Sequence, residues 1–357
     1  MTAKELISSV RIAGRYTVQN GILYPAGSAA FIEFKTCSAH VAVTMTSDHH
    51  FGEETLRARA AVFIDGEREP SMRLALEKGE HTYTVFHEDK AREVVIRIMK
   101  YSEEAFASMG IVSIESDGPV TATASDRELL MEFVGDSITC GYGIEGVAEV
   151  DIFTTEQENP WKAYACRTAE LLQADFQLLS WSGNGMISQY IDDSVNERRT
   201  EKPLIPEMYP YSDRELEERM GIAPLTLWQD EREPDLVVIN IGTNDSSYTR
   251  DIPERNAFFN ETYSGFVDMV REKHPKAKII CLIGLMSQCV HEEIEKVVLA
   301  KRDGGDKDVY YLKAPLQNGA DGMGTDYHPS EVTHIKAAEM LAEFIRHDVL
   351  GNEEDFL

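Results

Sequence analysis

The chain has 357 residues, more than one compact core usually holds, so two domains are expected. With 43% hydrophobic and 27% charged residues, its composition is that of a globular protein and excludes a low-complexity or fibrous chain. The 35 Lys and Arg residues stand against 62 Asp and Glu residues. The resulting formal charge of −27 disfavours binding to nucleic acid or to an anionic membrane.

The first ten residues lack the long apolar core of a signal peptide, and no apolar run reaches the roughly 18 residues that span a bilayer. We therefore expect a cytoplasmic protein with no membrane partner. The five cysteines are widely spread and form neither a CxxC pair nor a Cys/His ligand pattern. Neither a disulfide framework nor a metal site is expected, and no cofactor is expected either.

Up to about residue 120 the sequence predicts short alternating strands rich in β-branched residues and separated by turns. The predicted strands are Ala29–Phe34, Val41–Thr46, Arg59–Ile64, His81–His87 and Glu93–Lys100. Several strands at this spacing favour a β-sandwich of the jelly-roll kind. The polar stretch Ser116–Arg127 is the expected connection, so residues 1–122 and 123–357 are predicted to be the two domains.

Beyond residue 125, short apolar runs alternate with amphipathic stretches, as in a sheet covered by helices on both faces. The predicted strands are Leu129–Val134, Phe176–Trp181, Leu236–Ile241, Ile279–Leu285 and Val309–Leu312. The predicted helices are Trp161–Gln173, Asn256–Lys273, Val290–Arg302 and Ser330–His347, the last with Ser330 as its N-cap. This pattern predicts a three-layer α/β/α domain with a mostly parallel sheet, whose functional loops follow the carboxyl ends of the strands.

One long stretch, from about Ser188 to Pro234, fits neither pattern because it is charged and dotted with proline and aromatic residues. An insertion of this length after a strand either helps to form a substrate cleft or is a solvated addition to the surface.

Four short blocks place polar residues at strand ends or just before a helix. They are Gly135-Asp136-Ser137, Ser180–Gly185, Ile241–Asp245 and Gly324–Pro329. Each block alone has an ordinary structural explanation, such as a turn, a flexible glycine or a helix cap. Because all four occur in order at positions that converge in an α/β sheet, together they indicate one catalytic site.

These blocks resemble those of the SGNH, or GDSL-like, hydrolases, a family named for Ser, Gly, Asn and His in that order. The matching positions are Ser137, Gly183, Asn244 and His328. The resemblance implies a serine esterase in which His328 takes the proton of the Ser137 hydroxyl and later donates it to the leaving alcohol. The N–H groups of Ser137 and Gly183 and the side-chain amide of Asn244 would then form the oxyanion hole.

The sequence departs from the commonest family pattern at the acid. Most members carry Asp three residues before the histidine, where this chain has Thr325, and the nearest carboxylate belongs to Asp326. The order Asp-aromatic-His-Pro is similar to that of carbohydrate esterase family two, whose members also carry a jelly-roll domain ahead of the hydrolase domain. The resemblance implies that Asp326 orients His328 as the triad acid, with a backbone carbonyl as the alternative.

The same resemblance implies that the ring of Tyr327 stacks on a sugar, and we expect Trp181 and Asp136 near the substrate as well. Asp136 is also expected to fix the turn before Ser137 by hydrogen bonding. The predicted function is removal of O-acetyl groups from acetylated oligosaccharides of manno- or xylo-type, derived from hemicellulose, through an acetyl-serine intermediate. Two alternatives stay open, an SGNH esterase or lipase for other acyl esters and a carbohydrate-binding protein with an inactive hydrolase domain.

Overall fold

The computed structural model describes residues 3–351, which form two compact units. The first unit consists of the chain up to Asp126 together with two later segments, 154–158 and 211–229. The second unit contains the rest of the described chain. The two later segments lie within the part of the sequence expected to belong to the second domain. Their membership of the first unit comes from contacts between residues far apart in the chain.

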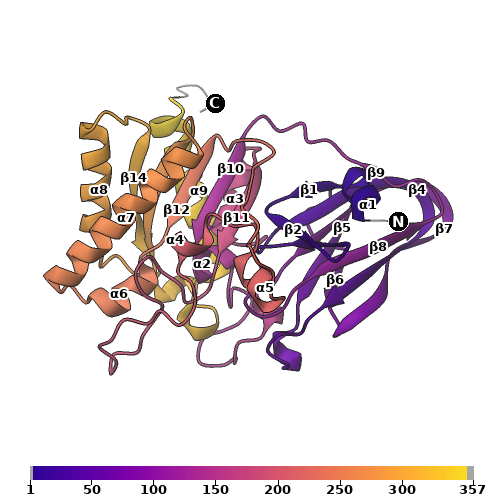
Figure 1. The fold of residues 1–357 in the computed structure, drawn as a ribbon, viewed down its shortest axis with the longest axis horizontal. Coiled ribbons are helices and arrows are strands. Elements are labelled where there is room, and N and C mark those ends of the chain that lie inside the picture. Colours follow the sequence, from indigo (N-terminus) through magenta and orange to yellow (C-terminus); the bar gives the residue numbers. More distant parts are fainter. Residues whose placement is uncertain (1–2, 352–357) are drawn as a thin grey trace. The chain divides into compact units, whose positions relative to one another are not determined.

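Within the described residues, the first unit is a curled, nine-stranded antiparallel sheet (Figure 1, indigo to purple). Its strands are β1 (Arg11–Ala13), β2 (Tyr16–Gln19), β3 (Ile22–Pro25), β4 (Phe31–Ser47), β5 (Arg59–Ile64), β6 (Met72–Ala75), β7 (Gly79–Lys100), β8 (Gly110–Ser116) and β9 (Thr121–Ala122). The order is β2-β3-β8-β4-β7-β5-β6, and β1 and β9 also pair with β4. Helices α1 (Ala3–Ser9) and α5 (Arg214–Arg219) belong to this unit. The finer jelly-roll topology stays a prediction.

Two strands of this sheet are longer than the sequence predicts. β4 contains most of the first two predicted strands, and β7 contains the last two. The strands pair with register shifts between Ser38 and His40 and between Val41 and Ala42. A register shift bends a strand without ending it. A polar stretch that the sequence presents as a turn is therefore a bend in a continuous strand.

The second unit contains a sheet with five strands in the described chain, and it is parallel throughout where the sequence predicted a mostly parallel sheet. The strands are β10 (Leu130–Gly135), β11 (Asp175–Ser180), β12 (Leu236–Asn240), β13 (Lys278–Leu285) and β14 (Val309–Leu316). Met131, Phe133 and Val134 of β10 have no exposed surface. Burying such a side chain contributes about 2 kcal/mol, so this strand is firmly anchored below the site.

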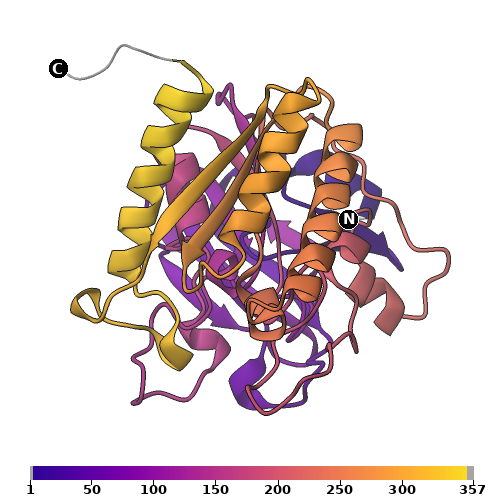
Figure 2. The ribbon, with the colours of Figure 1, turned by 90° about the vertical axis from the view of Figure 1, so that its left-hand side faces the viewer.

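Helices cover both faces of the parallel sheet. Figure 2 shows α9 on one side of β14 and α7 and α8 on the other. The helices are α2 (Ser137–Cys140), α3 (Tyr164–Leu171), α4 (Ile205–Met208), α6 (Thr243–Thr249), α7 (Pro253–Lys273), α8 (His291–Asp303) and α9 (Glu331–Phe344), which continues as a π-helical turn over Ile345–Val349. Ser330 caps α9 as predicted, because its Oγ accepts from the Thr333 amide at 3.3 Å.

The strand order is β11-β10-β12-β13-β14, so the chain moves from β10 to one neighbour and then crosses to the other side. At such a switch point the loops that leave neighbouring strands diverge and open a crevice at their carboxyl ends. Three of the four sequence blocks follow β10, β11 and β12, and they therefore meet at this point.

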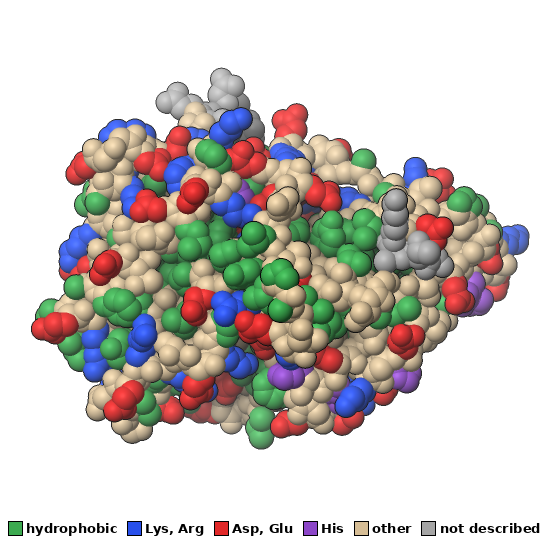
Figure 3. Space-filling model, viewed as in Figure 1, with side chains coloured by type: hydrophobic (Ala, Val, Ile, Leu, Met, Phe, Trp, Pro, Cys, Tyr) green, Lys and Arg blue, Asp and Glu red, His purple; other side chains and the backbone are tan. Residues whose placement is uncertain are grey.

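Within residues 3–351, no helix has both the length and the apolar character needed to cross a bilayer. On the face drawn in Figure 3, acidic and basic side chains are interspersed, with apolar surface between them. This mixture means that the excess of acidic residues is spread over that face rather than concentrated at one place.

Candidate active site

Ser137 lies at the tight turn between β10 and α2. Asp136 caps α2, because its Oδ1 accepts from the Ile138 amide at 3.0 Å. A Cβ on Gly135 would lie 1.9 Å from Oγ1 of Thr139, so only glycine fits at that position. The turn thus places Ser137 directly at the carboxyl end of a central strand.

The imidazole of His328 contacts the hydroxyl of Ser137, with 2.9 Å between Nε2 and Oγ. This distance is suitable for proton transfer. Burial lowers the pKa of His328 below 6.5, against the opposing effects of the Thr325 carbonyl and the Asp326 charge. The ring is therefore neutral at neutral pH and able to accept the serine proton.

The other ring nitrogen of His328, Nδ1, lies 3.2 Å from the carbonyl oxygen of Thr325. The carboxylate of Asp326 instead accepts a hydrogen bond from the hydroxyl of Tyr142, at 2.8 Å from Oδ2. Of the two groups that were expected to orient the His328 ring, the Thr325 carbonyl contacts it and the Asp326 carboxylate does not. Donation from Nδ1–H to this carbonyl leaves Nε2 as the acceptor that faces Ser137.

Two backbone amides are available to an oxyanion. Within residues 3–351, neither the amide of Ser137 nor that of Gly183 has a hydrogen-bond partner. Gly183 adopts a φ of +72°, and no heavy atom lies within 4 Å of the position that a Cβ would take. Its carbonyl accepts from the amide of Tyr190 at 2.9 Å, which ties the insertion to this loop. Such amides suit an oxyanion hole.

Asn244, in the first turn of α6, joins the loops that follow three neighbouring strands. Its Nδ2 donates to the carbonyl oxygen of Asn184 at 2.8 Å and to Oδ2 of Asp136 at 3.2 Å. The shorter bond fixes the direction of the amide. The longer bond ties the Asn244 amide to the nucleophile turn.

Asp245 positions the loop that follows β11, a role that the sequence analysis did not assign to it. Its buried carboxylate accepts from the amides of Met186, Ile187 and Ser188 at 2.9, 2.7 and 3.1 Å. Burial raises its pKa to about 6, against the lowering effect of these amides. Asp245 thereby holds the loop that carries Gly183. The sequence signal that could have identified Asp245 was its position directly after Asn244 in the third block.

The three residues expected near the substrate differ in exposure. Tyr327 is 51% exposed, and its hydroxyl donates to Oε1 of Glu149 at 2.7 Å. Trp181 keeps only 7% of its surface exposed, and Asp136 is fully buried in the nucleophile turn. Tyr190, which the sequence analysis did not single out, is 50% exposed. Its only signal was the aromatic content of the insertion.

A buried group formed by Glu132, Asp230 and His274 comes within reach of a single cation. Its carboxylates already have hydrogen-bond partners. Gln177 donates to both of them, at 3.1 and 2.8 Å, and Lys273 pairs with Asp230 at 2.9 Å. The two carboxylates are thus already held by neighbouring side chains, and Nε2 of His274 lies 3.4 Å from Oε2 of Glu132 without a hydrogen bond in the described part of the chain.

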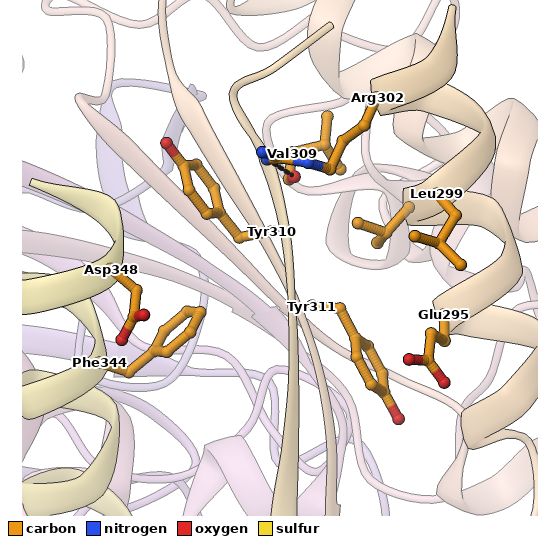
Figure 4. Close-up of a pocket in the computed structure, with 9 residues that line it drawn as sticks. Glu295, Leu299, Arg302, Val309, Tyr310, Tyr311, Phe344 and Asp348 are labelled. Atoms are coloured by element: carbon orange, nitrogen blue, oxygen red, sulfur yellow. Dashed lines mark hydrogen bonds between the residues drawn. The ribbon is translucent and has the colours of Figure 1, made fainter.

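A cavity of about 330 Å³ lies between α8, β14 and the end of α9 (Figure 4). Its lining includes Glu295, Arg302, Tyr311 and Asp348. None of the predicted site residues contributes to it, so this cavity is separate from the Ser137–His328 pair.

A serine–histidine pair beside unpaired amides, at the carboxyl ends of neighbouring parallel strands, is the arrangement of the serine hydrolase class. Comparison with known proteins makes the class specific. Residues 133–334 match the model of the GDSL-like Lipase/Acylhydrolase family, which is more than half of the chain. The chain belongs to this family, and the resemblance deduced from the four blocks is confirmed.

The similar proteins include carbohydrate esterases. The chain is 33% identical over 234 residues to the cellulase/esterase CelE of Acetivibrio thermocellus, covering 64% of this chain but 27% of that protein. It is 28% identical over 295 residues to an acetylxylan esterase/glucomannan deacetylase of Cellvibrio japonicus, covering 80% of this chain and 75% of the relative. Among solved structures, a family two carbohydrate esterase from Clostridium thermocellum in complex with cellohexaose has a TM-score of 0.83. That match has 26% identity and covers 96% of this chain and 99% of the other.

Proposed function

We propose that this protein is a serine esterase that removes O-acetyl groups from carbohydrates. One observation carries the proposal. Nε2 of His328 lies 2.9 Å from Oγ of Ser137, and the amides of Ser137 and Gly183 have no hydrogen-bond partner in the described chain. The acetyl group and the carbohydrate are supported by the relatives, which are named as an acetylxylan esterase and a glucomannan deacetylase.

In the proposed reaction, Oγ of Ser137 attacks the carbonyl carbon of the acetyl ester while Nε2 of His328 takes the hydroxyl proton. The negative charge moves to the carbonyl oxygen, where the amides of Ser137 and Gly183 and Nδ2 of Asn244 stabilise it. Each such donor contributes on the order of 3 kcal/mol. Collapse breaks the bond to the sugar oxygen, which receives the proton from His328. A water molecule then repeats the sequence on acetyl-serine and releases acetate.

The charge of the protein and its exposed aromatic rings support the proposed substrate class. A formal charge of −27 is compatible with a neutral sugar. Tyr327 and Tyr190 expose about half of their surfaces, and aromatic faces can stack against sugar rings. We propose manno- or xylo-oligosaccharides derived from hemicellulose as the substrates. The cytoplasmic location stays a prediction.

A second candidate is an esterase for longer acyl chains, and one observation favours it. Val147, Val150 and Ile152 are exposed on the loop that also carries Glu149. An apolar acyl chain would bury part of this surface. The third reading, a carbohydrate-binding protein with an inactive hydrolase domain, is disfavoured by the intact Ser137–His328 contact.

Mass spectrometry of acetylated manno- and xylo-oligosaccharides before and after incubation tests the proposal. We expect loss of acetyl groups and, after an acid quench, an acetylated peptide that contains Ser137. Ser137→Ala should abolish both signals while the thermal unfolding curve stays that of a folded protein. A p-nitrophenyl ester series separates the two candidates. Turnover should be fastest with acetate, and turnover that rises with acyl length would replace the first candidate by the second.

A further inference from the structure

Two segments that are far apart in the sequence dock through their backbones beside the catalytic pair. The nucleophile loop, residues 142–153, follows α2, and the histidine strap, residues 323–328, precedes α9. The amide of Thr325 donates to the carbonyl of Gly143 at 3.0 Å. A Cβ on Gly324 would lie 2.3 Å from that carbonyl oxygen, so no side chain fits between the two segments. The nucleophile loop therefore packs directly against the strap that carries His328.

Tyr142, the first residue of the nucleophile loop, contacts the catalytic base directly. Its ring centroid lies 4.5 Å from that of His328, with 41° between the ring planes. Its ring also stacks on Phe153, at 3.6 Å and 9°. The imidazole therefore lies against an aromatic pair, which restricts rotation of the His328 ring and excludes water from one side of it.

The hydroxyl of Tyr142 is anchored by Asp326 on the strap, with 2.8 Å between the oxygens. Asp326 and its neighbour Tyr327 both have left-handed backbone angles, with φ of 51° and 58°. For such residues this conformation costs on the order of 1 kcal/mol or more each. It directs the Asp326 carboxylate toward Tyr142, while the Tyr327 hydroxyl binds Glu149 on the same loop at 2.7 Å. Two hydroxyl–carboxylate bonds thus hold the strap to the loop.

We propose that Tyr142 is a positioning residue for His328, and that Asp326 acts on the base through Tyr142 by anchoring its hydroxyl. The inference rests on the proposed esterase function. The Thr325 carbonyl sets the tautomer of His328, and the Tyr142 ring sets the angle at which Nε2 meets Ser137. Both contacts concern proton transfer, so they affect kcat rather than the KM of a small ester.

The test measures kcat and KM for p-nitrophenyl acetate. Tyr142→Phe keeps the ring and Asp326→Ala removes the anchor, so each should lower kcat about three- to tenfold, the worth of one hydrogen bond. The double variant should be no slower than the slower single one, because both remove the same bond. Tyr142→Leu removes the ring as well and should cost about 100-fold in kcat. KM should stay within about twofold throughout, because the acetyl contacts are untouched.

Asp326→Asn separates anchoring from the role of a triad acid. An asparagine tolerates the left-handed backbone and still accepts from the Tyr142 hydroxyl, so kcat should stay within about threefold. A triad aspartate replaced by asparagine loses about 10⁴-fold in the well-studied serine proteases, and a loss of that size would overturn the proposal.

The pH profile supplies a readout that a merely structural role would not move. The Asp326 charge also acts directly on the base by raising the pKa of His328, so Asp326→Asn should shift the acid limb of kcat/KM to lower pH whether or not Asp326 anchors Tyr142. Tyr142→Leu should shift it to higher pH, since water admitted to the ring relieves the burial that lowers this pKa.

Tyr310→Phe is the matched control, because the Tyr310 hydroxyl also lies near an aspartate, 3.4 Å from Oδ1 of Asp308, in the cavity wall of Figure 4. It should leave kcat and the pH profile unchanged. Thermal unfolding identifies any variant that fails to fold. If Tyr142→Leu fails to fold, Tyr142→Phe and Asp326→Asn still test the proposal. A wild type without ester turnover overturns the proposed function. An active wild type that is insensitive to Tyr142→Phe, or a double variant whose losses multiply, overturns only the positioning role.

Discussion

At the residue scale, the proposed role of Gly183 as an oxyanion donor depends on its backbone alone, and the chain contains a matched glycine for testing it. Gly183 has φ +72° and Gly221 has φ +70°, and neither would bring a Cβ within 4 Å of another heavy atom. Replacing either by alanine adds the same backbone strain, on the order of 1 kcal/mol. Only at Gly183 would that strain misdirect an amide that is proposed to bind the oxyanion.

We therefore predict that Gly183→Ala and Gly221→Ala lower the melting temperature by similar amounts. Gly183→Ala alone should lower kcat for p-nitrophenyl acetate, by about 10- to 100-fold, as a misdirected oxyanion donor does. Equal kcat values for the two variants would exclude the Gly183 amide from the oxyanion hole.

At the element scale, the loop after β11 depends on a carboxylate supplied by α6. The Asp245 carboxylate accepts hydrogen bonds from three backbone amides of this loop, and burial raises its pKa from 3.8 to about 6. The folded protein therefore holds the Asp245 proton more tightly than the unfolded chain does. The stability that this proton provides is present below about pH 4 and is lost as the pH rises through about 6, amounting to about 3 kcal/mol.

The Asp245→Asn side chain cannot titrate. Its NH2 group would face a backbone N–H, so that two hydrogen-bond donors would oppose each other. The variant should be less stable than the wild type by about 1–3 kcal/mol at pH 7. The gap should widen between pH 6 and pH 4, because only the wild type gains stability there. Thermal unfolding at the two pH values measures this difference, and a gap that stays constant would contradict the assigned pKa shift.

Elements differ in how far their sequences predict them. Each of the five apolar runs after residue 125 forms a strand of the parallel sheet, because a strand buried on both faces must be apolar along its length. β4 and β7 were predicted as four strands. Each of these strands bends where its pairing register with the other strand shifts. A register is a property of two paired strands and not of either one alone. A single run of sequence therefore carries no signal for it.

At the scale of the whole molecule, we expect the charge of −27 to disfavour anionic substrates relative to neutral ones. We predict that kcat/KM for a neutral acetylated oligosaccharide changes less than about twofold between roughly 20 mM and 500 mM salt. For an acetylated oligosaccharide that carries a uronic acid, kcat/KM should rise with salt, because screening weakens the repulsion between like charges. Parallel steady-state measurements of the two substrates check this, and identical salt responses would show that the protein's charge does not act at the site.

The sequence by itself determined the parallel α/β unit, the four blocks and thus the family. Order along the chain was sufficient because the carboxyl ends of parallel strands lie at one edge of the sheet, so blocks that follow neighbouring strands meet. Only the tertiary structure decided which group orients His328. Thr325 and Asp326 are three and two residues away, and spacing does not report the handedness of the turn between them. The left-handed turn at Asp326 carries its carboxylate to Tyr142 and leaves the Thr325 carbonyl on the ring.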